Sequence, residues 1–172
     1  MPKTTSQKIA VMEAKGLTNC ESIINASRRV KLPLEAACAL MQKESGGRNV
    51  YGHDSGGVFS RDEYPTVTGA NFFDFIVRVM NGATSNGVGP SQITYAGSNV
   101  GGHRDGGYFR EMAQLHLRPW IVEENMQFGF KILKGHYDAT HSWVAAGTRY
   151  NGAESYGRDL AAKVEQWKKA LA

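Results

Sequence analysis

The chain has little cysteine, no long apolar run and no internal repeat, and each absence excludes a class of protein. It has 172 residues and two cysteines, Cys20 and Cys38, too few for the disulfide framework of a small secreted domain. Both lie in predicted helices among apolar neighbours, so we expect buried free thiols. No apolar run approaches membrane-spanning length, and we therefore expect no membrane insertion.

A secretory signal and a concentrated basic surface are also absent. Residues 1–6 are polar and lack the hydrophobic segment of a signal peptide. The net charge of +4 favours an anionic partner. However, Lys and Arg are spread along the chain, and no compact basic stripe with interleaved aromatic residues suggests nucleic acid.

The sequence has no zinc-binding spacing such as H-E-x-x-H. A zinc peptidase acting on peptide stems would have to use His53, Asp54, His103 and Asp105. Histidines outside such a pattern are more often surface or turn residues. We therefore expect neither a metal nor a cofactor.

Helical periodicity dominates the chain and predicts a mainly α fold (α+β) with a minor β element. Helices are expected at about residues 9–15, 18–30, 33–45, 72–81, 120–137, 142–150 and 160–171. Thr18 and Glu21 predict a capping box at the start of the second helix. In the glycine-rich stretch that follows the third helix, residues 49–51 and 57–59 are predicted to pair as a hairpin.

Glu44 is the most informative residue, because it places a carboxylate on the apolar side of a helix that ends at Gly46-Gly47. At about 100° per residue it projects between Leu40 and Ala37, so its carboxyl group should face the core or a cleft. Burial and the negative end of the helix dipole should both raise its pKa. Such a carboxylic acid can protonate a leaving group. A solvated helix end beside Lys43 is the alternative.

Four motifs occur in an order that resembles the lysozyme-like superfamily, specifically the goose-type lysozymes and soluble lytic transglycosylases that cleave peptidoglycan. The motifs are Glu44-Ser45, Gly89-Pro90-Ser91-Gln92-Ile93, Asn125 with Gly129 and Leu133, and Arg149-Tyr150-Asn151-Gly152. More narrowly, Tyr51-Gly52-His53-Asp54 and Asn86-Gly87-Val88-Gly89-Pro90 are similar to catalytic domains of phage endolysins that attack actinobacterial walls. The resemblance implies a helical domain with a small β-hairpin next to an active-site cleft.

The resemblance also implies roles for residues around Glu44, which would itself be the general acid. Ser45, Ser91 and Gln92 would contact the sugar. Tyr150 would position Glu44 through its hydroxyl, and Asn151 would bond to substrate or to loop backbone. A plain turn at residues 91–92 and core packing of Tyr150 are the structural alternatives.

Asp54 decides which reaction is predicted. It resembles the goose-type aspartate that holds the attacking water, and inverting hydrolysis needs such a carboxylate roughly 6.5 to 9.5 Å from the acid. A second aspartate, which follows the glutamine loop in goose-type enzymes, is replaced here by Thr94. A turn role within Asp54-Ser55-Gly56-Gly57 is the alternative for Asp54. Solvated surface positions are expected for Asp62, Glu63 and Asp74.

The sequence therefore predicts one lysozyme-like domain, residues 1–172, that hydrolyses the β-1,4 bond between N-acetylmuramic acid and N-acetylglucosamine. Lytic transglycosylation, in which the muramyl hydroxymethyl oxygen replaces water, is the runner-up. A noncatalytic wall-binding module is the alternative from another class. The expected partner is anionic bacterial peptidoglycan, bound by a monomer. As for a phage endolysin, we expect the chain in the host bacterial cytoplasm until it is released to the wall.

Overall fold

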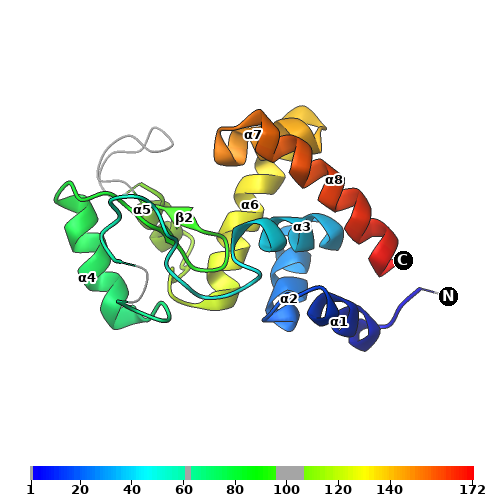
Figure 1. Ribbon diagram of the computed structural model, residues 1–172, viewed down its shortest axis with the longest axis horizontal. Helices are drawn as coiled ribbons and strands as arrows, with labels where there is room; N and C mark the ends of the chain where they lie inside the picture. The colour runs from blue at the N-terminus through cyan, green and yellow to red at the C-terminus, as the bar shows by residue number, and fades with distance from the viewer. Residues whose placement is uncertain (1, 61–62, 96–106) are drawn as a thin grey trace.

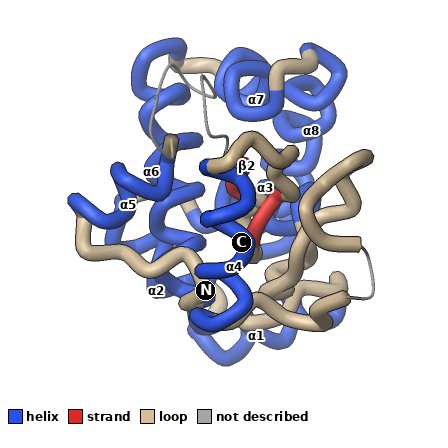
Figure 2. The backbone as a smooth tube through the Cα atoms, turned by 90° about the vertical axis from the view of Figure 1, so that its left-hand side faces the viewer, coloured by secondary structure: helices blue, strands red, loops and turns tan. Residues whose placement is uncertain are grey.

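The computed structural model describes residues 2–60, 63–95 and 107–172, and it is mainly helical (Figure 1). The helices are α1 (Thr5–Ala14), α2 (Cys20–Val30), α3 (Leu34–Glu44), α4 (Gly69–Met80), α5 (Tyr108–Gln114), α6 (Val122–Thr140), α7 (Trp143–Asn151) and α8 (Glu154–Leu171). Two short strands, β1 (Gly87–Val88) and β2 (Ile93–Thr94), pair antiparallel, and Figure 2 shows how small they are beside the helices. The predicted fold class, mainly α with a small β-hairpin, is confirmed.

Two clusters of buried apolar residues form the core, and α6 contributes to both. The first, the helical cluster, packs α1, α2, α3, α7 and α8 against Met126 and Phe130 of α6. The second, the hairpin cluster, packs α4, α5 and the hairpin against Phe128 of the same helix. In Figure 1, α6 runs between these two groups of elements. The chain passes from the first cluster to the second just after α3, which places Glu44 at their junction.

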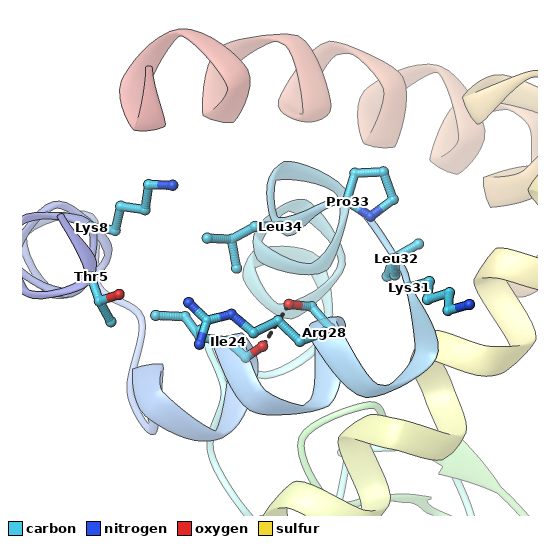
Figure 3. Close-up of a pocket in the computed structure, with 9 residues that line it drawn as sticks. Thr5, Lys8, Ile24, Arg28, Lys31, Leu32, Pro33 and Leu34 are labelled. Atoms are coloured by element: carbon cyan, nitrogen blue, oxygen red, sulfur yellow. Dashed lines mark hydrogen bonds between the residues drawn. The ribbon is translucent and has the colours of Figure 1, made fainter. Parts of the chain in front are cut away.

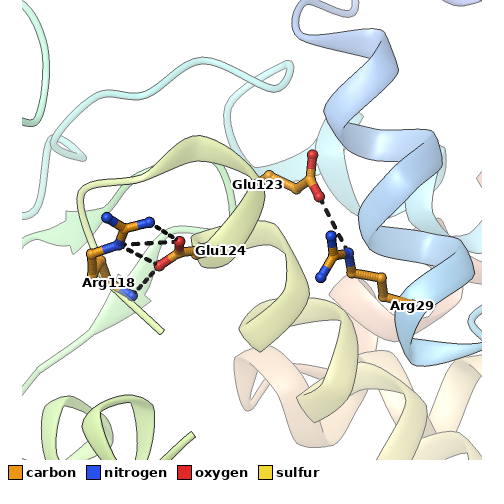
Figure 4. A network of polar contacts seen from close by, with 4 residues as sticks. All are labelled: Arg29, Arg118, Glu123 and Glu124. Carbon is orange, nitrogen blue, oxygen red and sulfur yellow. Dashed lines mark hydrogen bonds and ion pairs between the residues drawn. The ribbon is translucent and has the colours of Figure 1, made fainter. Parts of the chain in front are cut away.

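Ion pairs fix the start of α6 (Figure 4). Glu123 pairs with Arg29 of α2 at 3.5 Å. Glu124 accepts hydrogen bonds from Nε of Arg118 at 3.1 Å and 3.0 Å, one to each carboxylate oxygen. Both acids stand in the first turn of α6, where the helix dipole favours negative charge. The hydrogen bond from Arg118 lowers the pKa of Glu124, so this end of α6 is anchored to α2 and to the preceding loop.

The helix that carries Glu44 ends where the sequence predicts. Gly46 and Gly47 have φ angles of +71° and +84°, a region that glycine adopts without the steric cost of a side chain. A Cβ atom on Gly47 would lie 2.3 Å from the carbonyl oxygen of Thr18. The turn after Glu44 therefore needs glycine for its conformation and, at Gly47, for space.

The predicted location of the hairpin is wrong. Residues 49–51 and 57–59 do not pair with each other: the first segment bridges to Val88 and the second to Thr84. The Asn86 side chain separates the two loops: its Nδ2 donates to the carbonyl of Gly52, just after the first segment, at 2.9 Å and to the carbonyl of Phe59 at 3.0 Å. Both segments therefore align along residues 84–88, which the sequence-based prediction treats as loop, and the paired strands are β1 and β2.

Two local details also differ from the prediction. The N-cap of α2 is Asn19, with φ of 53° and no side-chain cap bond, so the capping box assigned to Thr18 and Glu21 is wrong. The Thr18 hydroxyl instead donates to the Gly46 carbonyl at 3.2 Å. The seven-residue helix α5 is missing from the prediction because it buries only Met112 and shows little apolar periodicity.

The buried thiols are as predicted: Cys20 and Cys38 are both free and buried. Burial raises the pKa of the Cys38 thiol, so this thiol stays protonated and packs as a small apolar side chain. Trp167 is also buried, and its indole N–H donates to Gln42 Oε1 at 2.9 Å. Within the described ranges, none of the helices combines the length and apolarity needed to cross a bilayer.

Candidate active site

The Glu44 side chain is partly buried at the C-terminal end of α3, and its Oε1 accepts a hydrogen bond from the Tyr156 hydroxyl. Burial is the largest influence on its pKa and raises it. The Tyr156 hydrogen bond and the Lys43 charge lower the pKa, whereas the Asp54 charge raises it, and the net direction is upward. This direction agrees with the prediction from the sequence. The carboxyl group therefore keeps its proton at higher pH than an exposed glutamate and can donate it.

Tyr156 is held in place where α3 packs on α8. The Lys43 amino group lies 4.1 Å from the centroid of the Tyr156 ring, a cation–π arrangement. The same amino group pairs with Asp159, one turn further along α8. Burial raises the pKa of Tyr156, and the Glu44 carboxylate raises it further. The phenol therefore stays protonated and acts as a fixed donor to Glu44.

Tyr150 does not make the contact predicted for it. Its hydroxyl donates to the Ser91 carbonyl at 2.9 Å, and its ring packs against the helical cluster. The prediction that Tyr150 positions Glu44 through its hydroxyl is therefore wrong, and Tyr156 makes that contact instead. Burial raises the pKa of Tyr150, and the Glu44 charge raises it further, so the phenol stays protonated and keeps donating to Ser91.

Residues 89–92, which connect β1 to β2 and are called here the 89–92 turn, are fastened from three helices. Ser45, just after α3, donates to the Pro90 carbonyl at 2.8 Å. Ser91 N–H donates to Asn125 Oδ1 of α6 at 2.9 Å, and Tyr150 of α7 donates to the Ser91 carbonyl. Four motifs that are far apart in the sequence thus meet at one turn, directly beside the residue that follows Glu44.

Gly89 and Asn125 fit together at the centre of this arrangement. Gly89 has a φ of +72°, and a Cβ atom there would lie 2.6 Å from Asn125 Nδ2. Asn125 is fully buried, and its Nδ2 donates to the Val88 carbonyl at 3.0 Å. The turn can therefore approach α6 this closely only with glycine at position 89.

Replacement of Asn125 by Ala is expected to lower the free energy of unfolding by about 2–4 kcal/mol. It leaves the buried Ser91 N–H and Val88 carbonyl without their partner, and each such loss costs about 1–3 kcal/mol. Asn25→Ala is the matched control, because this exposed amide makes one 3.3 Å bond to Glu123 and should change stability by less than about 0.5 kcal/mol. Equal losses in urea unfolding would contradict the anchoring role of Asn125.

Ser45 and Ser91, which are predicted to contact the sugar, have covered side chains. Ser45 is 5% exposed and Ser91 is fully buried. Ser45 Oγ donates to Pro90 and accepts from Gly47 N–H at 3.1 Å, and Ser91 Oγ donates to the Asn125 carbonyl at 3.3 Å. Both hydroxyls are thus committed to the protein, and their contact with substrate stays a prediction. They position the 89–92 turn, and the sequence could not show that both are covered.

A groove of about 370 Å³ adjoins the turn, and the predicted residues Gln92, Tyr150 and Asn151 line it together with Tyr108 and Arg149. Asn151 is exposed at the end of α7, whereas Gln92 is partly buried. The groove thus combines amide groups, aromatic rings and one cation, a mixture suited to a carbohydrate with acetamido and carboxylate groups. Direct contact of Gln92 and Asn151 with substrate stays a prediction.

Gln92 has its amide nitrogen committed to the protein. Its Nε2 donates to the Val50 carbonyl at 3.2 Å and to the Gly89 carbonyl at 2.8 Å. A Cβ atom on Gly52 would lie 2.3 Å from Gln92 Oε1, so the Gly52 backbone lies directly against the oxygen end of the amide. Gln92 therefore links the 89–92 turn to the loop that carries Asp54.

The Asp54 side chain is exposed, and its Oδ2 accepts from the Gly87 N–H of β1 at 2.7 Å. Its backbone carbonyl accepts from Gly57 N–H at 3.0 Å, which is the turn predicted as its structural alternative. Its charge also raises the pKa of Glu44, so the two carboxylates interact electrostatically. The position of Asp54 is therefore compatible with both roles, a second carboxylate and a turn residue.

A metal centre finds no support in the part of the chain that the structure describes, where no three His, Cys, Asp or Glu side chains gather as ligands. His103 and Asp105, two of the four residues considered for zinc, lie outside the described residues, as does Asp62.

No protein-family model, curated protein or solved structure matches the chain. The family resemblance therefore depends on the sequence motifs alone.

Proposed function

We propose that this protein cleaves the β-1,4 bond between N-acetylmuramic acid and N-acetylglucosamine in bacterial peptidoglycan, with Glu44 as the general acid. One observation carries the proposal. Glu44, whose pKa is raised, directly precedes Ser45, and Ser45, Asn125 and Tyr150 all form hydrogen bonds to the 89–92 turn. Protonation of the leaving oxygen is the step that glycosidic cleavage requires from an acid of this kind.

The groove beside the turn supports a glycan as the substrate. Asn151 offers an exposed amide group for hydroxyl and N-acetyl groups, and Tyr108 offers an aromatic ring, while Gln92 holds the turn at the edge of the groove. Arg149 adds a cation in the same groove, which suits the lactyl and peptide carboxylates of the muramyl residue. No metal ion or cofactor takes part in the proposed reaction. Action on the wall after release from the cytoplasm stays a prediction.

Hydrolysis is the first choice for the reaction, with Asp54 holding the attacking water. Lytic transglycosylation is the second candidate, and one observation favours it: Asp54 uses an oxygen to accept from Gly87 N–H and closes a turn with its carbonyl. In that reaction Glu44 would take the proton of the muramyl hydroxymethyl group after donating its own to the leaving oxygen, and Asp54 would be dispensable.

Digestion of purified peptidoglycan tests the function directly. We expect soluble fragments that mass spectrometry identifies as muropeptides cut at the glycan bond. Fragments cut only within the peptide stem would indicate a peptidase, and retention on the wall without any cleavage would indicate the noncatalytic binding module. Either of these results would overturn the proposal.

Tyr156→Phe is expected to move the basic limb of the pH–activity profile upward. The acid must be protonated to act, so activity falls as the pH rises through the pKa of Glu44. The Tyr156 hydroxyl lowers that pKa, and its removal should therefore raise it, while the Phe ring keeps the packing under Lys43. Tyr137→Phe is the control, because it removes the same hydroxyl group from a tyrosine that stacks on Trp143, with ring centroids 3.9 Å apart, instead of bonding to Glu44. An unmoved or downward-shifted limb in Tyr156→Phe would contradict this positioning role.

A further inference from the structure

A second groove, drawn in Figure 3, lies at the start of α3, whereas Glu44 is the last residue of that helix. It has a volume of about 390 Å³ and is lined by Lys8 of α1, by Arg28 and Lys31 at the end of α2, and by Pro33 and Leu34 at the start of α3. At 1.5 Å per residue, the ten steps from Leu34 to Glu44 separate it from the acid by about 15 Å. It is therefore distinct from the groove beside the 89–92 turn.

The charge around this basic groove is positive and unpaired. Among the described residues that line it, none is acidic. Within the described ranges, Lys8, Arg28 and Lys31 form no ion pair, whereas Arg29 and Arg118 each pair with a glutamate. An uncompensated group of cations around a concave surface raises the local concentration of anions.

A role in stabilising α2 explains the presence of two of these three cations but not of the third. Arg28 and Lys31 stand at the C-terminal end of α2, where the helix dipole favours cations whether or not a ligand binds. Lys8 belongs to another helix and has no such role. In Figure 3 its side chain extends from α1 toward Leu34, with the Arg28 guanidinium on the α2 side of the same space. Cations from two helices thus face one groove.

The residues that line the groove also indicate which class of anion it can bind. The apolar contribution comes from Ile24, Leu32, Pro33 and Leu34, and the part of the chain that the structure describes contributes no aromatic residue to the lining. A nucleic-acid strand would find no ring on which to stack its bases. Aliphatic side chains suit the C–H faces of sugars or polyols, and Lys and Arg suit phosphate.

We propose that the basic groove binds a phosphodiester-linked sugar or polyol polymer attached to the bacterial wall. The polymer phosphates contact Lys8 and Arg28, with Lys31 at the end of the groove, and its carbon backbone lies on the aliphatic residues. Such binding holds the protein on its insoluble substrate while the separate site around Glu44 acts on the glycan. The inference takes from the proposed function only that the wall is the partner.

The test measures binding without catalysis, in a Glu44→Gln background. Purified walls are used before and after hydrofluoric acid treatment, which cleaves phosphodiester-linked polymers and leaves the peptidoglycan. We expect the protein to sediment with untreated walls several-fold more than with stripped walls, and this difference should shrink as added salt screens the charges. Equal sedimentation with both wall preparations would overturn the inference.

Paired charge variants locate the binding surface. Lys8→Gln with Arg28→Gln should weaken binding to untreated walls about tenfold, equivalent to about 1.4 kcal/mol for two charge contacts at the surface. Arg110→Gln with Lys131→Gln removes the same charge at two exposed positions on α5 and α6 and should bind like the parent. Equal weakening in both pairs would show an effect of net charge alone and would overturn the groove assignment. Thermal melting of both pairs confirms that they are folded.

Two further measurements distinguish wall-polymer binding from nucleic-acid binding and from the proposed cleavage activity. Effective competition by a single-stranded oligonucleotide, at the same phosphate concentration as the released polymer, would assign the groove to nucleic acid and overturn the inference. With Glu44 intact, both double variants should cleave soluble glycan fragments as fast as wild type. If wild type cleaves no glycan while the groove-dependent binding persists, the proposed function fails and the basic groove stands.

Discussion

Glu44→Gln should reduce the clearing of purified cell walls by at least about a hundredfold, the usual scale of acid–base catalysis. Glutamine keeps the size of the side chain, and its amide oxygen can still accept from the Tyr156 hydroxyl, but it has no proton to donate to the leaving oxygen. Since burial raises the pKa of Glu44, the uncharged glutamine should also be tolerated by the fold. Turbidity and release of soluble muropeptides measure the loss.

Glu35→Gln is the matched control for this variant. Glu35 stands in the first turn of the same helix, so the change removes the same charge from α3 at the end remote from the 89–92 turn. We expect the control to clear walls at nearly the wild-type rate. A folded Glu44→Gln protein that clears walls as well as Glu35→Gln would leave Glu44 without a catalytic role.

The helices were predictable from the sequence because their apolar residues repeat locally. Leu160, Val164, Trp167 and Leu171 lie on one side of α8 and are buried in the helical cluster, as the period of 3.6 residues requires. The same reasoning placed Glu44 on a partly buried helix face. Its raised pKa follows from that local pattern, without knowledge of what packs against it.

The hairpin was misplaced because strand pairing here depends on non-local contacts. The real strands are two residues long, too short for an alternating pattern to be recognised. The segments 49–51 and 57–59 have suitable residues for strands, but the buried Asn86 amide lies between them and bonds to both sides. The position of a single asparagine in the sequence does not indicate that its side chain will separate two loops.

Tyr156 shows what sequence reasoning missed in the site. It lies four residues before Leu160 and therefore on the same face of α8 as the buried stripe, a signal that was present in the pattern. Its contact with Glu44 spans 112 positions and depends on how α8 packs on α3, which periodicity does not provide. The burial of Ser45 and Ser91 was missed for the same reason, because it depends on the other helices that cover the turn.

Asp54→Asn separates hydrolysis from transglycosylation. If Asp54 accepts a proton from the attacking water, the change should reduce activity by about a hundredfold, because a carboxamide cannot act as that base. The amide oxygen can still accept from Gly87 N–H, so the contact with β1 and the stability of the fold should be kept. Asp74→Asn, which removes a surface carboxylate paired with Arg78, is the control for charge.

The products that the wild-type protein releases from peptidoglycan decide the same question independently. Hydrolysis leaves a reducing N-acetylmuramic acid end, because water adds to the carbon from which the leaving sugar departs. Internal attack by the muramyl hydroxymethyl oxygen gives an anhydro product lighter by the mass of one water molecule. Reducing ends together with an inactive Asp54→Asn protein would establish Asp54 as the residue that holds the water. Anhydro products from an Asp54→Asn protein as active as wild type would leave Asp54 as a turn residue, and Glu44 would then act as acid and base in succession.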